Sequence, residues 1–198
     1  LKFDGTLIIQ AQSKGPIQLL VVECKSDLSM RATVKLSVDP SEIASDATLG
    51  DLLDVSNSGR LVITLDPADR EPGQAPYQGI VALQDHQGAV IKPVTSAAEA
   101  IALYMQNSEQ LDTRIWLASS DTHVGGLLLQ RLPNSGGHAH LDPQIAAEGW
   151  SRIQTLGETI TNEELLTLPP ETILRRLFLE ESTENGVRSF PARPIRFA

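Results

Sequence analysis

The feature that most constrains the fold is a period of two in the apolar residues of the first half of the chain. From residue 31 to residue 38 every second side chain is apolar, and residues 6–12 repeat the pattern at Leu7, Ile9 and Ala11. Successive side chains of a strand point to opposite faces, so this alternation predicts half-buried strands. Residues 17–24 are apolar in both phases, which predicts a strand covered on both faces. Gly15-Pro16 predicts a turn, so the first two strands should form a hairpin.

Helix-start signals occur between the strands. Thr48 is a predicted N-cap of a short helix. Ser96 and Glu99 form a predicted capping box, in which each side chain satisfies a backbone N–H group. Further strands are expected at residues 61–65, 77–84, 113–118 and 126–132. A glycine-rich boundary at residues 134–137 ends this strand-rich part.

Beyond that boundary the pattern is helical. Asp142-Pro143 places a cap before a proline at the first helical position. Thr161 and Glu164 form a second predicted capping box, and residues 171–181 carry an apolar stripe at helical spacing. Strands that precede helices are typical of the α+β class rather than of a wound α/β fold.

The composition excludes several classes of protein. The 198 residues carry a net charge of −9, whereas a nucleic-acid binder takes much of its affinity from Lys and Arg. No apolar run approaches the roughly 20 residues that span a bilayer. Cys24 is the only cysteine, which excludes an internal disulfide and a cysteine-based zinc finger in this chain and suits a reducing compartment. Because Cys24 ends an apolar strand, we predict a buried structural thiol rather than a reactive one.

Two groups of residues are candidates for chemistry. Ser120, Asp121 and His123 have the side-chain types of a hydrolase triad, but triad members normally come from distant parts of a fold. A polar turn between two strands is the competing interpretation. His138 and His140 are candidates for binding a transition metal, or are solvated side chains of a loop. The chain is therefore predicted not to be an enzyme and to have no catalytic residues, with a small hydrolase and a histidine-based metal-binding adaptor as the alternatives.

Large apolar side chains crowd the predicted helices between residues 165 and 178. One interpretation is an ordinary core packed against a sheet. The other is a detachable amphipathic cover whose release exposes an apolar surface for unfolded proteins. The candidate residues for binding such proteins are Leu165, Leu166, Leu168, Ile173, Leu174, Leu177 and Phe178.

Five stretches stand out in order along the chain: Leu1-Lys2-Phe3-Asp4-Gly5 followed by Gln10, Gln12 and Gly15-Pro16, then YQGIV at 77–81, NSEQLDTR at 107–114, GGLLLQ at 125–130 and EELLTLP at 163–169. These stretches resemble the heat-shock protein thirty-three family of redox-regulated holdase chaperones. Together they extend over nearly the whole chain, which makes the resemblance specific.

The resemblance implies an ATP-independent chaperone of the cytoplasm that binds unfolding client proteins during oxidative stress. It implies a homodimer in the active form, and no partnership with nucleic acid or membrane. The implied core, at residues 1–135, consists of packed β-sheets with helices in β-β-α layers, and a helical linker follows at residues 136–186. Beyond Ala198 the family has a small domain in which four cysteines hold zinc when reduced and release it when they form disulfides.

The chain departs from the family pattern at both ends. A segment that normally precedes Leu1 is missing, and residues 187–198 are expected to begin the connection to the zinc domain. Cys24 matches none of the four switch cysteines, so no cofactor is assigned to this chain. We expect the linker helices to pack on an apolar sheet face and the redox switch to belong to the longer protein.

Overall fold

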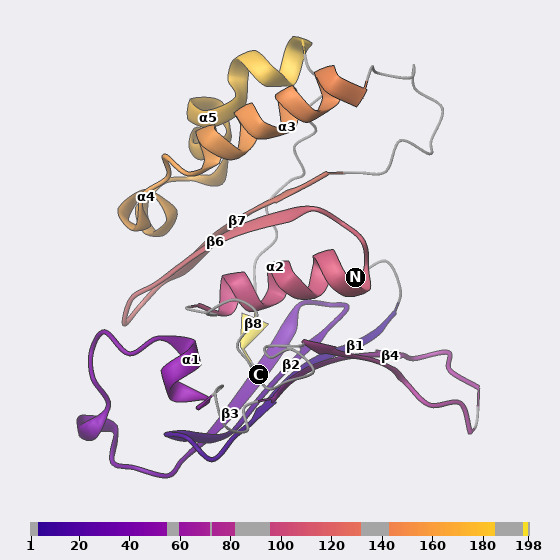
Figure 1. Ribbon diagram of the computed structural model, residues 1–198, viewed down its shortest axis with the longest axis vertical. Helices are drawn as coiled ribbons and strands as arrows, with labels where there is room; N and C mark the ends of the chain where they lie inside the picture. The colour runs from indigo at the N-terminus through magenta and orange to yellow at the C-terminus, as the bar shows by residue number, and fades with distance from the viewer. Residues whose placement is uncertain are drawn as a thin grey trace. The chain divides into compact units, whose positions relative to one another are not determined.

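The computed structural model describes residues 4–54, 60–71, 73–81, 96–131, 143–184 and 196–197. These residues fall into two compact units, one running up to Tyr104 and including the C-terminal strand, the other running from Met105 to Arg193. Each unit has its own sheet and its own helices (Figure 1).

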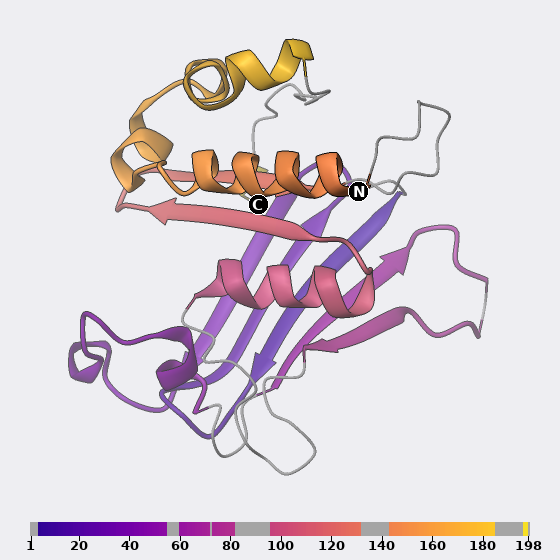
Figure 2. The ribbon, with the colours of Figure 1, turned by 45° about the horizontal axis from the view of Figure 1, so that its top comes forward.

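The first unit is built on a six-stranded sheet with the strand order β5-β4-β1-β2-β3-β8. Neighbouring strands are antiparallel except for β3 and β8, which are parallel. Figure 2 shows β1 to β5 side by side, with the helix α2 lying across them. The strands are β1 (Gly5–Gln12), β2 (Ile17–Lys25), β3 (Ser29–Leu36), β4 (Arg60–Pro67), β5 (Tyr77–Val81) and β8 (Arg196–Phe197).

The hairpin of β1 and β2 confirms the predicted turn at Gly15-Pro16. The Ser13 hydroxyl accepts a hydrogen bond from the Gly15 N–H (3.0 Å) and donates one to the Ile17 carbonyl (2.5 Å). Gly15 is buried, and a Cβ at this position would lie 2.8 Å from the carbonyl oxygen of Leu52. Glycine therefore lets the turn approach the end of the short helix α1 (Leu49–Leu52).

The half-burial predicted from the alternation at residues 31–38 is wrong for β3, where residues 31–35 are all exposed, and in β1 only Ala11 of the alternating apolar residues is buried. Burial in this sheet is instead centred on β4. Leu61 and Ile63 of β4 are buried, and Leu61 lies between Ala11 of β1 and Val81 of β5, which are also buried. β2 differs from the prediction of two covered faces, because its apolar residues are only half-buried in both phases. The helix η1 (Pro40–Glu42) and α2 (Ala97–Ser108) complete the helical elements described up to residue 108.

The predicted cap at Thr48 is confirmed, and so is the serine half of the predicted capping box at Ser96 and Glu99, while Asp142 lies outside the described residues. The Thr48 hydroxyl accepts a hydrogen bond from the Asp51 N–H (3.2 Å), and the Asp51 carboxylate accepts one from the Thr48 N–H (3.0 Å). Ser96 accepts a hydrogen bond from the Glu99 N–H at 3.2 Å. These bonds satisfy N–H groups that a helix leaves without intrahelical partners.

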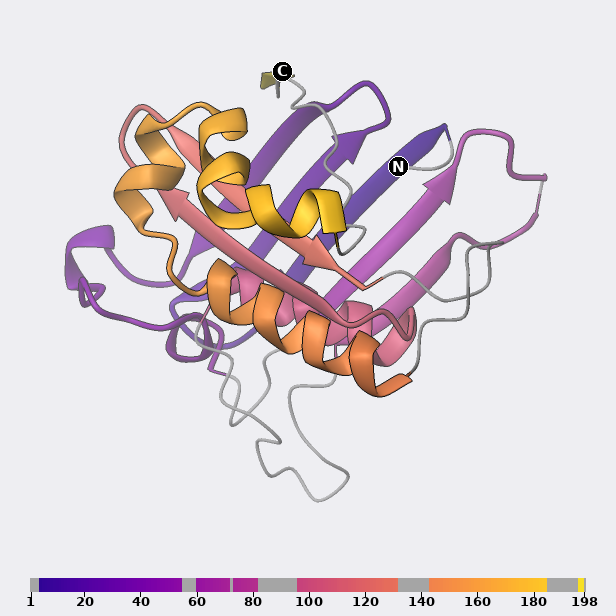
Figure 3. The same ribbon diagram turned by 90° about the horizontal axis from the view of Figure 1, so that it is seen from above.

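The second unit places helices on one side of a β-hairpin (Figure 3). Its described elements are β6 (Thr113–Ser119), β7 (Val124–Gln130), α3 (Pro143–Gly157), α4 (Asn162–Thr167) and α5 (Pro170–Glu184). Antiparallel sheets with helices confirm the predicted α+β class. No helix in the part of the chain that the structure describes is long and apolar enough to cross a membrane.

The predicted division into a core at residues 1–135, a linker at 136–186 and a connection at 187–198 stays a prediction. The compact units group the β6–β7 hairpin with the helices assigned to the linker. Residues 132–142 and 185–195 lie outside the described residues.

Candidate functional site

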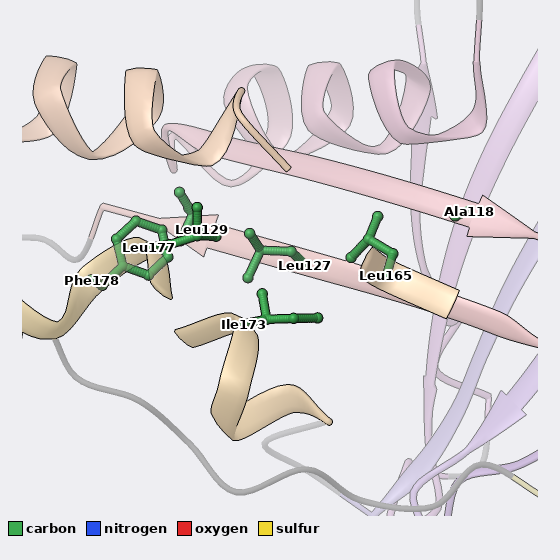
Figure 4. Close-up of a cluster of buried hydrophobic side chains, with 7 residues drawn as sticks. All are labelled: Ala118, Leu127, Leu129, Leu165, Ile173, Leu177 and Phe178. Carbon is green, nitrogen blue, oxygen red and sulfur yellow. The ribbon is translucent and has the colours of Figure 1, made fainter. Parts of the chain in front are cut away.

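A buried apolar cluster joins the hairpin and the helices of the second unit (Figure 4). Its buried members, which we call the hairpin–helix cluster, are Ala118, Leu127, Leu129, Leu165, Ile173, Leu177 and Phe178. Three further predicted residues, Leu166, Leu168 and Leu174, are partly buried and packed against it. The seven residues predicted to bind unfolded proteins thus lie together, and their packing against one another and the hairpin covers them. The expected packing of these helices on an apolar sheet face is confirmed, and their role in binding stays a prediction.

The hairpin contributes to the cluster through the period-two pattern of its strands. Ala118 of β6 and Leu127 and Leu129 of β7 lie on the same face, and Trp116, opposite Leu127 in the register, packs beside them. Both strands were predicted from the sequence, but these residues were not among the predicted site residues. The continuous apolar run at residues 115–118, which places apolar side chains on both faces of a strand, was the available signal.

The other face of the hairpin is apolar and exposed. Leu117, Val124 and Leu128 are exposed by 50%, 59% and 57%. Their places in the register put them on the face opposite Ala118 and Leu127. A two-stranded ribbon that is apolar on both faces has one face covered by helices and one available for contact with another molecule.

α4 is positioned by the predicted capping box. The Thr161 hydroxyl accepts a hydrogen bond from the Glu164 N–H (3.2 Å), and the Glu164 carboxylate accepts one from the Thr161 N–H (2.9 Å). The same carboxylate pairs with Arg176 of α5, with Nε and Oε1 2.7 Å apart. The Thr161 N–H, and then the Thr161 hydroxyl and Arg176, hold the pKa of Glu164 below its ordinary value.

This pKa shift predicts a loss of stability in acid. A carboxyl whose pKa is lowered in the folded state stabilises that state above its unfolded pKa of about 4.3, and loses the effect as pH falls through the folded pKa. Glu164→Gln is expected to lower the urea midpoint at pH 7 and to match the wild type at the acid end of a series from pH 7 to pH 2. Glu163→Gln, an exposed neighbour with the same charge change, is the control. If the difference in urea midpoint between the wild type and Glu164→Gln were the same at every pH, the prediction would be contradicted.

Two glycines allow main chain to approach closely in this unit. A Cβ on Gly125 would collide with the backbone carbonyl of Leu165, so α4 lies directly against β7. A Cβ on Gly157, the last residue of α3, would lie 2.6 Å from Cη2 of Trp116. From the sequence, Gly125 is only part of a family stretch, because a glycine alone does not reveal which element it contacts.

The hydrolase alternative falls on the turn between β6 and β7. The Ser120 hydroxyl accepts a hydrogen bond from the His123 N–H (3.1 Å), while His123 Nδ1 lies 2.8 Å from the Thr122 hydroxyl. Ser120, Asp121 and His123 are all exposed. Among these described residues no hydrogen bond joins the serine hydroxyl to the imidazole ring, although a nucleophile and its base require one. The arrangement is that of a polar turn, the competing interpretation.

The metal alternative cannot be placed in the same way. His138 and His140 lie outside the described residues. In the described ranges, no group of three or more His, Cys, Asp or Glu side chains is placed to hold a metal ion. Cys24 is half-buried in β2, and its thiol lies 3.6 Å from the carbonyl oxygen of Lys25. One cysteine does not fit a zinc site that needs four, so no zinc ligand is assigned here.

Comparison with known proteins gives consistent matches. The family described as Hsp33 protein matches residues 1–198. A 33 kDa chaperonin of Methylobacillus flagellatus is 42% identical over 193 residues, covering 98% of this chain and 56% of the relative. A 33 kDa chaperonin of Pseudomonas aeruginosa is 40% identical over 197 residues, covering 100% of this chain and 58% of the relative. The chain thus spans somewhat more than half the length of these relatives.

A solved structure supports the fold. The crystal structure of a 33 kDa chaperonin from Thermotoga maritima, a heat shock protein 33 homologue, matches with a TM-score of 0.59 at 18% sequence identity. The match covers 90% of this chain and 56% of that one. At this level of identity the likeness concerns the α+β arrangement alone.

Proposed function

Because this chain belongs to the Hsp33 protein family, we propose that it is the client-binding part of a molecular chaperone that holds unfolding proteins without ATP. The observation that carries the proposal is the β6–β7 hairpin, which is apolar on both faces. Exposed apolar side chains that adjoin one another are typical of sites that bind other proteins. The proposed activity is binding rather than catalysis.

The two faces of the hairpin have different parts in this proposal. The surface that first contacts a client consists of Leu117, Val124 and Leu128, because these side chains are exposed in the folded protein. The helices α4 and α5 cover the second face, and their displacement uncovers the hairpin–helix cluster for further binding. The second step uses the seven predicted residues, from Leu165 to Phe178, as binding surface.

The proposal is tested by light scattering of a heat-unfolding client protein mixed with this chain in the absence of ATP. The wild type is expected to suppress aggregation. The double variant Leu117→Ser, Leu128→Ser should need about tenfold more chain for the same effect, because it loses apolar area that a client would bury. The control is Val34→Ser, Ile80→Ser, at positions 53% and 66% exposed in the first unit. Failure of the wild type to suppress aggregation, or equal loss in both double variants, would overturn the proposal.

Redox control is proposed for the longer protein and not for this chain. Four cysteines in a zinc-binding domain would be the switch, whereas this chain has Cys24 alone and cannot close an internal disulfide. Suppression by this chain is therefore expected to be equal with and without a thiol reductant in the same assay. A strong dependence on reductant would refute this part.

The remaining assignments are also proposals. We place the protein in the cytoplasm, where a reduced thiol is stable, and propose a homodimer for the full-length form, with unfolded proteins as its clients. The net charge of −9 favours solubility of a chain with exposed apolar side chains, and it disfavours nucleic acid as a partner.

A further inference from the structure

The helix α5 consists of two segments that meet at Phe178. This residue has φ −134° and ψ 17°, outside the helical range, although helix continues on both sides. The segment before it supplies Ile173 and Leu177 to the hairpin–helix cluster. Phe178 is itself 3% exposed, while the next residue, Leu179, is 56% exposed. We call residues 179–184 the distal segment.

An ion pair attaches the distal segment to α3. The Glu181 carboxylate accepts hydrogen bonds from Nε of Arg152 (2.6 Å) and from Nη2 of Arg152 (2.9 Å). Glu181 is only 7% exposed, whereas the Arg152 side chain is 51% exposed. A two-point guanidinium–carboxylate contact is among the stronger and more directional of hydrogen-bonded pairs. The contact also raises the pKa of Arg152, so the guanidinium stays charged.

The distal segment depends on this tertiary contact because its own sequence disfavours helix. Glu180 and Glu181 lie close to the C-terminal end of α5, where the helix dipole disfavours negative charge. Among the described residues, the last contribution of α5 to the cluster is Phe178. A short helical segment with little apolar burial forms weakly by itself. Its position is therefore set largely by what anchors Glu181.

We propose that Arg152 and Glu181 form an ionic latch that holds the distal segment down and keeps Phe178 against the hairpin. Opening the latch frees residues 179–184 to turn away at Phe178, and uncovers the adjacent part of the hairpin–helix cluster. The regulatory meaning rests on the proposed function, since the uncovered surface would bind clients. The latch itself is a property of the fold and is testable without any client.

Hydrogen exchange measured by mass spectrometry on the 198-residue chain tests the latch. Glu181→Gln and Arg152→Gln are each expected to speed exchange of the amides of residues 178–184 on the order of tenfold. Each variant leaves the remaining charged side chain of a partly buried pair without its oppositely charged partner. Exchange in β1 and β4 should stay at the wild-type rate. The control Glu180→Gln makes the same charge change at the exposed adjacent position, outside the pair with Arg152, and should speed exchange clearly less than Glu181→Gln.

Two further variants separate a specific pair from a general loss of charge. The double variant Arg152→Gln, Glu181→Gln should exchange no faster than either single variant, because both remove the same interaction. The swapped variant Arg152→Glu, Glu181→Arg should recover much of the protection. Equal exchange in Glu181→Gln and Glu180→Gln, or additive effects in the double variant, would overturn the latch.

The aggregation assay then distinguishes the latch from the proposed function. If exchange is faster and suppression by Glu181→Gln is several-fold stronger than by the wild type, both are supported. If exchange is faster but suppression equals that of the wild type, control of client binding by the latch is overturned while the chaperone proposal stands. If no variant and no wild type suppresses aggregation, the proposed function fails and the exchange data alone decide the latch.

Discussion

Replacing Phe178 by alanine is expected to lower the free energy of unfolding of the second unit by about 3–5 kcal/mol. The side chain is 3% exposed and belongs to the hairpin–helix cluster. Its removal takes away apolar contacts and leaves a cavity that the β-strands beneath it are too constrained to fill. Both tryptophans of the chain, Trp116 and Trp150, pack against this cluster, so their fluorescence in urea reports on this unit.

The neighbouring residue gives a matched control. Leu179→Ala removes an apolar side chain from the same helix at a position 56% exposed, and should change the free energy of unfolding by no more than about 0.5 kcal/mol. Phe178→Ala should also bind an apolar dye more strongly than Leu179→Ala does, because loosened packing exposes the hairpin–helix cluster. If Phe178→Ala were as mild as Leu179→Ala, the cluster would not be the core of this unit.

Local sequence signals were sufficient for the elements that build the site. The capping box at Thr161 and Glu164 involves residues three apart, and the apolar run at residues 115–118 of β6 involves neighbours, so each could be predicted without knowing the fold. The helical spacing of Ile173, Leu174 and Leu177 also predicted which face of α5 is apolar. These are properties of short segments, and short segments are what a sequence pattern describes directly.

Tertiary partners were not predictable in the same way. Periodicity identifies the apolar face of α5 but not the surface that covers it, so core and detachable cover remained as alternatives. The pair of Arg152 and Glu181 joins residues 29 positions apart, with no local pattern to link them. The half-burial of β2 has the same origin. An apolar strand indicates that both of its faces are suited to burial, but it does not show that other elements pack on both faces.

The first unit and the second differ in how their apolar surfaces are used. In the first unit, Leu61 and Ile63 are buried side chains of a six-stranded sheet, as in an ordinary core. In the second, a narrow hairpin must supply apolar contacts to three helices, and a two-stranded ribbon is barely stable by itself. The hairpin and its helical cover therefore depend on each other, and a change at their contact should affect both.

The contact of Gly125 with Leu165 provides such a change. Gly125→Ala is expected to lower the free energy of unfolding of this unit by about 3 kcal/mol, because the new methyl group would meet a backbone carbonyl that no rotamer change can move. The strand must shift or α4 must lift from β7, and lifting α4 takes Leu165 out of the cluster. Urea unfolding followed by tryptophan fluorescence measures the cost, and faster hydrogen exchange of residues 162–167 would locate it in α4.

The adjacent glycine makes this a controlled comparison. A Cβ on Gly126 points to the opposite face and would meet Cδ2 of Leu117 at 2.9 Å, the end of a flexible and exposed side chain. Gly126→Ala is therefore expected to cost less than about 1 kcal/mol. Both variants make the same change in chain entropy within the same strand, so that effect cancels in the difference. What remains is the contact between β7 and α4. Equal stability losses would mean that α4 does not rest on the hairpin at Gly125, whereas a selective loss would identify this contact as the point where the helical cover is held.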